Sequence, residues 1–183
     1  PGLKIVYPSS PYDAKGLLNA AIEDPNPVLF FEHKGMYRSQ VDNVPDEYYT
    51  AQIGKGKIAR EGDEISIITY GMGVIWAKEF QEENTEVDLE IIDLRSLVPW
   101  DKELVKQSVK KTGKAIILTE DSITGAISAE IASWVSDTLF QHLDAPVKRV
   151  GALDTPVPFN KNLEDNFLPK ERFKLMVEEL SNY

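Results

Sequence analysis

The feature that most constrains the fold is a series of short apolar runs separated by amphipathic segments, which begins near Gly56 and continues to the end of the chain. Several runs are almost continuously apolar, as in parallel strands covered on both faces. The segments between them carry apolar residues at helical spacing. This alternation predicts a three-layer α/β domain with a mostly parallel sheet. The expected strands are 57–60, 65–70, 89–94, 115–118 and 147–150, and the expected helices are 73–83, one starting at the Asp101 cap, 125–142 and 170–180.

The first 33 residues show a smaller unit of the same kind. Residues 4–7 and 28–31 are predicted strands, and a helix between them begins with Ser10 as N-cap, Pro11 at the first helical position and Asp13 completing a capping box. Strand, helix, strand predicts a right-handed crossover between parallel strands. So small a unit does not bury enough surface to fold alone. The predicted apolar face of its helix is Ala14, Leu17, Leu18, Ala21 and Ile22.

Residues 34–55 are polar and irregular, with Pro45 among them. A structureless run of about 20 residues is unusual inside a compact domain. We therefore expect a linker between two units, partly ordered by what it packs on.

Composition excludes several classes of function. The chain has 20 basic and 30 acidic residues and a net charge of −10, which argues against nucleic acid and against anionic membrane surfaces but permits a basic protein partner. It has no cysteine, so disulfides, thiolate zinc sites and cysteine nucleophiles are excluded. No apolar run approaches the roughly 20 residues that span a bilayer. The cytoplasm is the default expectation.

One local pattern is typical of a dinucleotide site. Gly71 and Gly73 follow a predicted strand and open a helix, and Asp93 closes the next strand, where a ribose-binding acid would lie. Trp76, however, stands where close packing of helix on strand requires Gly or Ala. A tight strand-to-helix turn explains both glycines without a nucleotide.

Other polar residues lie at ends of predicted elements. Arg95 follows one strand, and Glu120 and Asp121 follow another, with a turn at Gly125; ligands bind at such strand ends in open α/β sheets. His33 and His142 have no carboxylate or serine placed beside them by a known signature, so we expect structural roles for both.

The segment 20–27 ends a helix and offers Asp24, Asn26 and backbone carbonyls. Oxygen ligands of this kind suit a hard cation. An ordinary polar helix stop with Pro25 and Pro27 explains the same residues.

Four long stretches carry a family resemblance when taken together and in order. They are "PGLKIVYPSSPYDAKGLLNAAIEDPNPVLFFEHKGMYR", "DLRSLVPWDKELVKQSVKKTGK", "LTEDSITGAISAEIA" and "LDAPVKRVGALDTPVPF…FLPK". The chain resembles the C-terminal part of the beta subunit, or the beta half of a fused chain, of thiamine-diphosphate-dependent 2-oxo acid dehydrogenases of the branched-chain 2-oxoacid and pyruvate types. The resemblance covers essentially all 183 residues.

The resemblance implies two parts. Residues 1–50 would be the C-terminal remnant of a pyrimidine-binding domain with a linker, and residues 51–183 a C-terminal domain of the transketolase type with a five-stranded, mostly parallel sheet. The family's catalytic glutamate and histidine, and its diphosphate and magnesium site, match no position in this sequence. We therefore expect no catalytic and no cofactor-binding residue in this chain, and thiamine diphosphate and magnesium only in a full enzyme.

The resemblance also carries over one metal site. Beta subunits of the branched-chain type bind potassium through the stretch that matches Ala21, Asp24 and Asn26, with Ala21 contributing its backbone carbonyl. The remaining ligands have no counterpart in this sequence, so we expect a weakened or empty site. Many relatives have His-Glu-Ala where this chain has Thr119-Glu120-Asp121, so no role of that histidine is carried over to this chain.

The implied whole protein oxidatively decarboxylates a 2-oxo acid and transfers the acyl group to lipoyl. This part would supply assembly and be inactive alone. Expected partners are a second copy, an alpha subunit or alpha half, and the small basic subunit-binding domain of the lipoyl acyltransferase, docked near Tyr183. A stand-alone acidic dimeric interaction domain and a nucleotide-binding regulatory domain are the alternatives.

Overall fold

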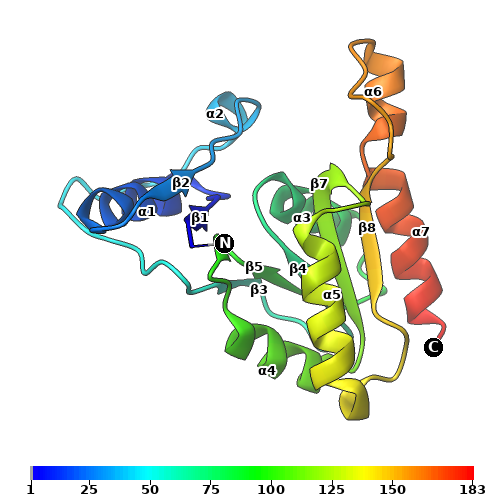
Figure 1. Ribbon diagram of the computed structural model, residues 1–183. Helices are drawn as coiled ribbons and strands as arrows, with labels where there is room; N and C mark the ends of the chain where they lie inside the picture. The colour runs from blue at the N-terminus through cyan, green and yellow to red at the C-terminus, as the bar shows by residue number, and fades with distance from the viewer. Residues whose placement is uncertain (1) are drawn as a thin grey trace.

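The computed structural model describes residues 2–183, which form two units joined side by side (Figure 1). The larger unit is built on a five-stranded sheet in the order β3-β5-β4-β7-β8. All neighbouring strands are parallel except β3, which runs antiparallel to β5 at the edge. The strands are β3 (Lys57–Arg60), β4 (Ile65–Thr69), β5 (Leu89–Asp93), β7 (Ala115–Ser122) and β8 (Lys148–Ala152).

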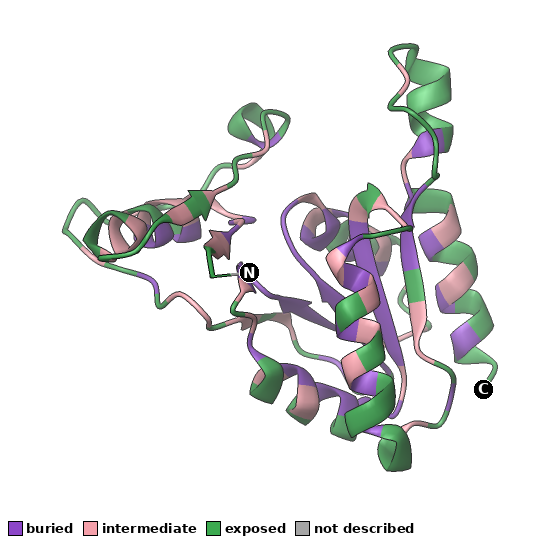
Figure 2. Cartoon of the chain, in the orientation of Figure 1, coloured by how far each residue is buried: buried purple, intermediate pink, exposed green. Residues whose placement is uncertain are grey.

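Helices cover both faces of this sheet, as the continuous apolar strands require. On one face, α3 (Met72–Glu83) and α7 (Lys170–Ser181) bury residues such as Val74 and Phe173. On the other, α4 (Lys102–Thr112) and α5 (Ile127–Thr138) bury Val105 and Ile131. Figure 2 shows the central strands as the buried middle layer. The predicted three-layer α/β class is confirmed.

The smaller unit consists of β1 (Lys4–Val6), α1 (Pro11–Glu23) and β2 (Val28–Phe30), and β1 and β2 are parallel as expected. A short strand from the larger unit, β6 (Ser96–Val98), pairs antiparallel with β1. The resulting sheet has the order β2-β1-β6, so a backbone ladder joins the two units. Within residues 34–55, the chain forms one short helix, α2 (Met36–Ser39).

Helix α1 begins where expected, but its first turn differs from a capping box. The Ser10 hydroxyl accepts a hydrogen bond from the Asp13 backbone N–H at 3.2 Å. The Asp13 carboxylate, in contrast, accepts hydrogen bonds from the side chains of Ser10, Lys57 and Arg95. Of the predicted apolar face, Leu17 is fully buried, whereas Leu18 and Ile22 are 46% and 75% exposed.

Several element boundaries differ from the sequence prediction. Strand β7 continues to Ser122 because its end pairs with Ala152 of β8. The helix predicted over 125–142 is interrupted, so α5 ends at Thr138 and a 3₁₀ turn, η1 (Phe140–His142), follows. Three elements were not predicted: α2, β6 and α6 (Lys161–Phe167). Within residues 2–183, no helix combines the length and apolar character needed to cross a bilayer.

Candidate functional site

The sheet topology marks one place where a crevice should form. After β4 the chain passes through α3 to β5 on one side, and after β7 it passes through α5 to β8 on the other. Because β4 and β7 are neighbours, the connections at their carboxyl ends diverge, and ligands of open α/β sheets bind at such a point. A cavity of about 550 Å³ lies there, lined by Tyr70 after β4, Glu120 in β7 and Tyr7 after β1.

Three aromatic rings form one wall of this cavity. The Tyr7 ring lies 6.0 Å from the Phe31 ring and 5.5 Å from the Tyr70 ring, measured between centroids. Burial, together with the charge of Glu120, raises the pKa of Tyr7 to about 12. Burial also raises the pKa of Tyr70, with the carboxylate of Asp121 adding to the effect. Both phenols therefore stay neutral at physiological pH.

Acidic side chains also line the cavity. Glu120 and Asp121 come from the end of β7, and Glu164 comes from α6. His33 Nε2 lies 3.0 Å from Glu120 Oε1, which links the smaller unit to this strand end. The structure thus brings together His33, Glu120 and Asp121, which sequence reasoning considered separately.

A second polar cluster lies where the two units meet. Asp13 is fully buried and is paired with Arg95 at 2.8 Å and with Lys57. Burial alone would raise the pKa of Asp13, but hydrogen bonds from Lys57 and Arg95 outweigh it and hold that pKa below its ordinary value. Arg95 is committed to this pairing, so it is not a free ligand-binding group at the end of β5.

Asp93 belongs to the same cluster and shows the opposite behaviour. It has no exposed surface and accepts a hydrogen bond from the Ser9 hydroxyl. Burial raises its pKa to about 6, against the lowering effect of the Ser9 hydrogen bond. Because Asp93 is fully buried and its carboxyl accepts the Ser9 hydrogen bond, it is not available to bind a ribose.

The two glycines of the dinucleotide-like pattern are explained by close packing. Gly71 has a φ of +54°, and a Cβ there would lie 2.8 Å from the Tyr7 ring. A Cβ on Gly73 would lie 2.1 Å from the hydroxyl of Thr69. Trp76 is buried in the helix that follows. The pattern is a tight strand-to-helix turn that also lets the smaller unit approach.

The predicted potassium ligands lie together at the end of α1, but Asp24 already has partners. Its Oδ2 pairs with the ammonium group of Lys4, and its Oδ1 accepts a hydrogen bond from the Asn26 backbone N–H at 2.9 Å. Ala21 lies in the last turn of the helix, and Asn26 is exposed. A lysine side chain therefore supplies positive charge at the position expected for the cation.

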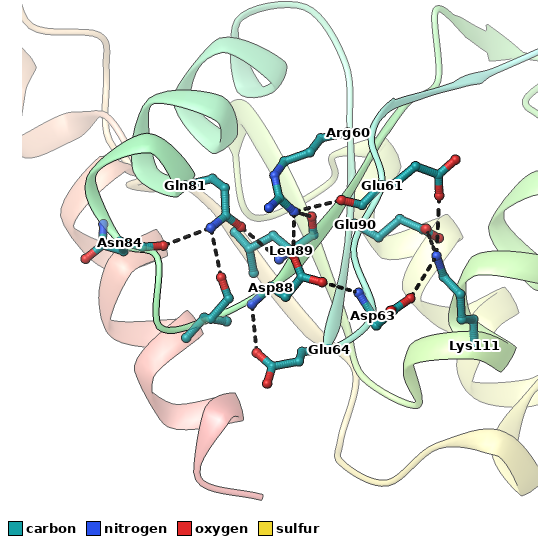
Figure 3. A network of polar contacts seen from close by, with 11 residues as sticks. Arg60, Glu61, Asp63, Glu64, Gln81, Asn84, Asp88, Leu89, Glu90 and Lys111 are labelled. Atoms are coloured by element: carbon teal, nitrogen blue, oxygen red, sulfur yellow. Dashed lines mark hydrogen bonds and ion pairs between the residues drawn. The ribbon is translucent and has the colours of Figure 1, made fainter.

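A third network of polar contacts lies at the end of the sheet opposite the cavity (Figure 3). Arg60 of β3 pairs with Asp88 at 2.8 Å, and Lys111 of α4 pairs with Glu90 of β5. Gln81 donates to and accepts from the backbone around residues 84–89. Every charged group in this network has a protein partner, so we interpret it as structural. His142 lies in η1 on the surface.

The aromatic wall is the part of the site that sequence reasoning missed. Tyr7, Phe31 and Tyr70 are the last residues of three predicted strands, and each directly follows an observed strand, β1, β2 or β4. That shared position is a usable signal, since strand ends of an α/β fold gather at one edge. The sequence alone does not predict that these rings cluster, because they come from two units whose relative placement depends on β6.

A mostly parallel three-layer α/β domain preceded by a β-α-β unit is the architecture of a transketolase-type C-terminal region. Residues 54–172 match the family model for the transketolase C-terminal domain, and the chain belongs to that family. Residues 1–40 match the model for the transketolase pyrimidine-binding domain.

The curated relatives include beta subunits of 2-oxo acid dehydrogenases and, at 46% identity over 92% of this chain, the acetoin:2,6-dichlorophenolindophenol oxidoreductase subunit beta of Bacillus subtilis (strain 168). The chain is 43% identical over 187 residues to the 2-oxoisovalerate dehydrogenase subunit beta of Bacillus subtilis (strain 168), covering 100% of this chain and 57% of the relative. It is 42% identical over 174 residues to the pyruvate dehydrogenase E1 component subunit beta of the same organism, covering 94% and 53%. The chain thus spans about half the length of the curated relatives it matches.

A solved structure shows the same fold. It is a "split gene transketolase, inactive beta4 tetramer", with a TM-score of 0.75 and 24% identity, and the match covers 98% of this chain and 57% of that one. At this identity the comparison supports the fold alone.

Proposed function

We propose that the chain is a C-terminal part of the beta component of a decarboxylating 2-oxo acid dehydrogenase and that its contribution is assembly. The similarity to such beta subunits, 43% identity along the whole chain in one case, carries this proposal. The whole protein would oxidatively decarboxylate a 2-oxo acid and transfer the acyl group to lipoyl, using thiamine diphosphate and magnesium. Its placement in the cytoplasm stays a prediction.

Residues 2–183 do not fit the diphosphate and magnesium end of that cofactor. The described residues contain no group of three or more His, Asp or Glu side chains placed to hold a metal ion. The 550 Å³ cavity is lined by Glu120, Asp121 and Glu164, which repel a diphosphate. We therefore derive no step through the cofactor for this chain.

Exposed apolar side chains support the assembly role. Val157, Phe159 and Leu163, on and before α6, are 66%, 106% and 59% exposed. Contiguous exposed apolar surface marks sites of protein association. Figure 1 shows α6 extending away from the sheet, as an element that contacts another subunit would.

Light scattering of purified wild type and variants tests this role. Phe159→Asp should reduce the self-associated fraction. Leu175→Asp, at a residue that is 63% exposed on α7, is the matched control and should leave it unchanged. A monomeric wild-type chain would refute the assembly proposal.

Binding to an alpha subunit distinguishes the enzyme proposal from the alternative of a stand-alone dimeric domain. Co-elution of the chain with a purified alpha subunit on size exclusion supports the first, and self-association without alpha binding supports the second.

Proteolysis tests the expected division into 1–50 and 51–183. Cuts should concentrate in 40–55, which is largely exposed.

The Ala21, Asp24 and Asn26 potassium site remains part of the proposal as a weak site, because Lys4 competes for Asp24. Potassium chloride should then raise the thermal midpoint of Lys4→Met more than sodium chloride does, and more than it does for the wild type. An equal response to both salts in the variant would remove the site from the proposal.

The proposed docking of a basic subunit-binding domain uses the C-terminal end of the chain. Tyr183 is 62% exposed after α7, and the chain carries a net charge of −10. Removing Tyr183 should weaken binding of that domain at low salt. Unchanged binding would exclude this docking site.

A further inference from the structure

The cavity at the carboxyl ends of β4 and β7 has a composition that selects one kind of ligand. Within the described part of the chain, its lining includes the acids Glu120, Asp121 and Glu164 and no lysine, arginine or histidine. Its remaining walls are mostly apolar or aromatic. Its volume of about 550 Å³ falls within the range of roughly 300–1,000 Å³ usual for small-molecule sites.

The aromatic wall is suited to a positive charge. The faces and edges of Tyr7, Phe31 and Tyr70 form a continuous surface, since neighbouring centroids are 5.5 and 6.0 Å apart. An organic cation over such rings is attracted by their quadrupoles as well as by dispersion. Tyr70 is only 8% exposed, so a cation that contacts its ring is partly removed from water, which strengthens the attraction.

The acidic side supplies the complementary charge. Glu120 Oε1 faces His33, while no hydrogen bond occupies its second oxygen among the residues described. Asp121 accepts one hydrogen bond, from the Ser122 backbone N–H at 3.0 Å, and is otherwise exposed toward solvent. Both carboxylates thus keep acceptor capacity for an ammonium group.

The same residues argue against other ligands. Anions are repelled by three carboxylates and by the net charge of −10. Bare metal ions lack a group of three or more His, Asp or Glu ligands among residues 2–183. Neutral apolar molecules would make no use of the free acceptor oxygens of Glu120 and Asp121.

We propose that this cavity binds a small organic ammonium ion of arylalkylamine type. Its ammonium group lies between the rings of Tyr7 and Tyr70 and the carboxylates of Glu120 and Asp121, and its apolar part lies against apolar lining residues such as Leu97 and Ile127. The site does not depend on the assembly role proposed above, because it rests on the cavity alone. Its position at the point where the strand connections diverge is where ligands of this fold class bind.

Three probes of one skeleton test the proposal: 2-phenylethylammonium, 2-phenylethanol and phenylacetate. Each is titrated into the uniformly ¹⁵N-labelled 183-residue chain at pH 7.5, with amide shifts as the readout. The ammonium ion should bind at least tenfold more tightly than the alcohol, shifting amides near Tyr7, Tyr70 and Glu120, and phenylacetate should not bind. Equal binding of the alcohol and the ammonium ion would overturn the proposal, as would no binding of the ammonium ion.

Variants locate the site. Glu120→Gln removes one charge and should weaken ammonium binding by about tenfold. Tyr7→Leu keeps an apolar side chain but removes the central ring and should weaken it similarly. Asp137→Asn, an exposed acid on α5 outside the cavity, is the matched control and should bind as the wild type does. Circular dichroism checks that each variant is folded, and unchanged affinity in both Glu120→Gln and Tyr7→Leu would refute the assignment.

Discussion

Asp93 provides the sharpest test of how the two units meet. Its carboxyl has no exposed surface, and burial raises its pKa from 3.8 to about 6. Between these values the unfolded chain has lost the proton and the folded chain keeps it. The contribution of Asp93 to stability is therefore complete below pH 3.8 and is lost as the pH rises through 6. A shift of roughly two pKa units corresponds to about 3 kcal/mol.

Asp93→Asn replaces the carboxyl by a neutral group of the same shape, which resembles the protonated acid. Urea unfolding of wild type and variant is followed between pH 4 and pH 7.5. The wild type should lose up to about 3 kcal/mol relative to the variant as the pH rises, and the variant should be the more stable at pH 7. Asp137→Asn, on the surface of α5, is the matched control and should follow the wild type.

The titration of Asp13 does not overlap with that of Asp93 in this pH range. Its pKa lies below the ordinary value, so its contribution to stability is lost only as the pH falls below about 3.8. A ¹³C titration of the Asp93 carboxyl should show a midpoint near 6. Parallel stability curves for wild type and Asp93→Asn, or a midpoint near 3.8, would refute the conclusion that a dry contact between the units holds this proton.

Three further substitutions test individual contacts. Asp13→Asn leaves Arg95 and Lys57 facing a neutral group at a buried site, so urea unfolding at pH 7 should show a loss of about 3 kcal/mol. Phe173→Ala removes a ring that is 1% exposed in the core, and chemical denaturation should show a loss of about 3–5 kcal/mol. Gly113→Ala places a Cβ on a residue with φ of +69° at the end of α4, which should lower stability by about 1–2 kcal/mol in the same assay.

Much of the larger unit could be predicted because its sequence signals are local. The runs 65–69 and 89–93 are apolar enough to identify as covered strands, and Asp101 caps the next helix as expected, accepting a hydrogen bond from the Leu104 N–H at 3.2 Å. Phe173, Val177 and Leu180 repeat at helical spacing and are buried. In each case one segment contains the whole pattern.

The missed features depend on contacts between distant segments. β6 has three residues, too few for a period, and it exists because β1 offers an edge. Of the α6 residues only Phe167 is buried, so the sequence has no apolar face at helical spacing that would predict this helix. The cavity combines residues from both units, and Asp13 was assigned to a local cap although its strongest partners are 44 and 82 positions away.

The ladder between β1 and β6 also sets an order of events during synthesis. Residues 96–98 leave the ribosome about 90 positions after Val6, an interval of roughly 5–20 s at 5–20 residues per second. Throughout that time one side of β1 has no strand to pair with, and an open strand edge is a template for the wrong partner. The nascent chain is therefore most vulnerable to misassembly, and most in need of a chaperone, before Ser96–Val98 emerge.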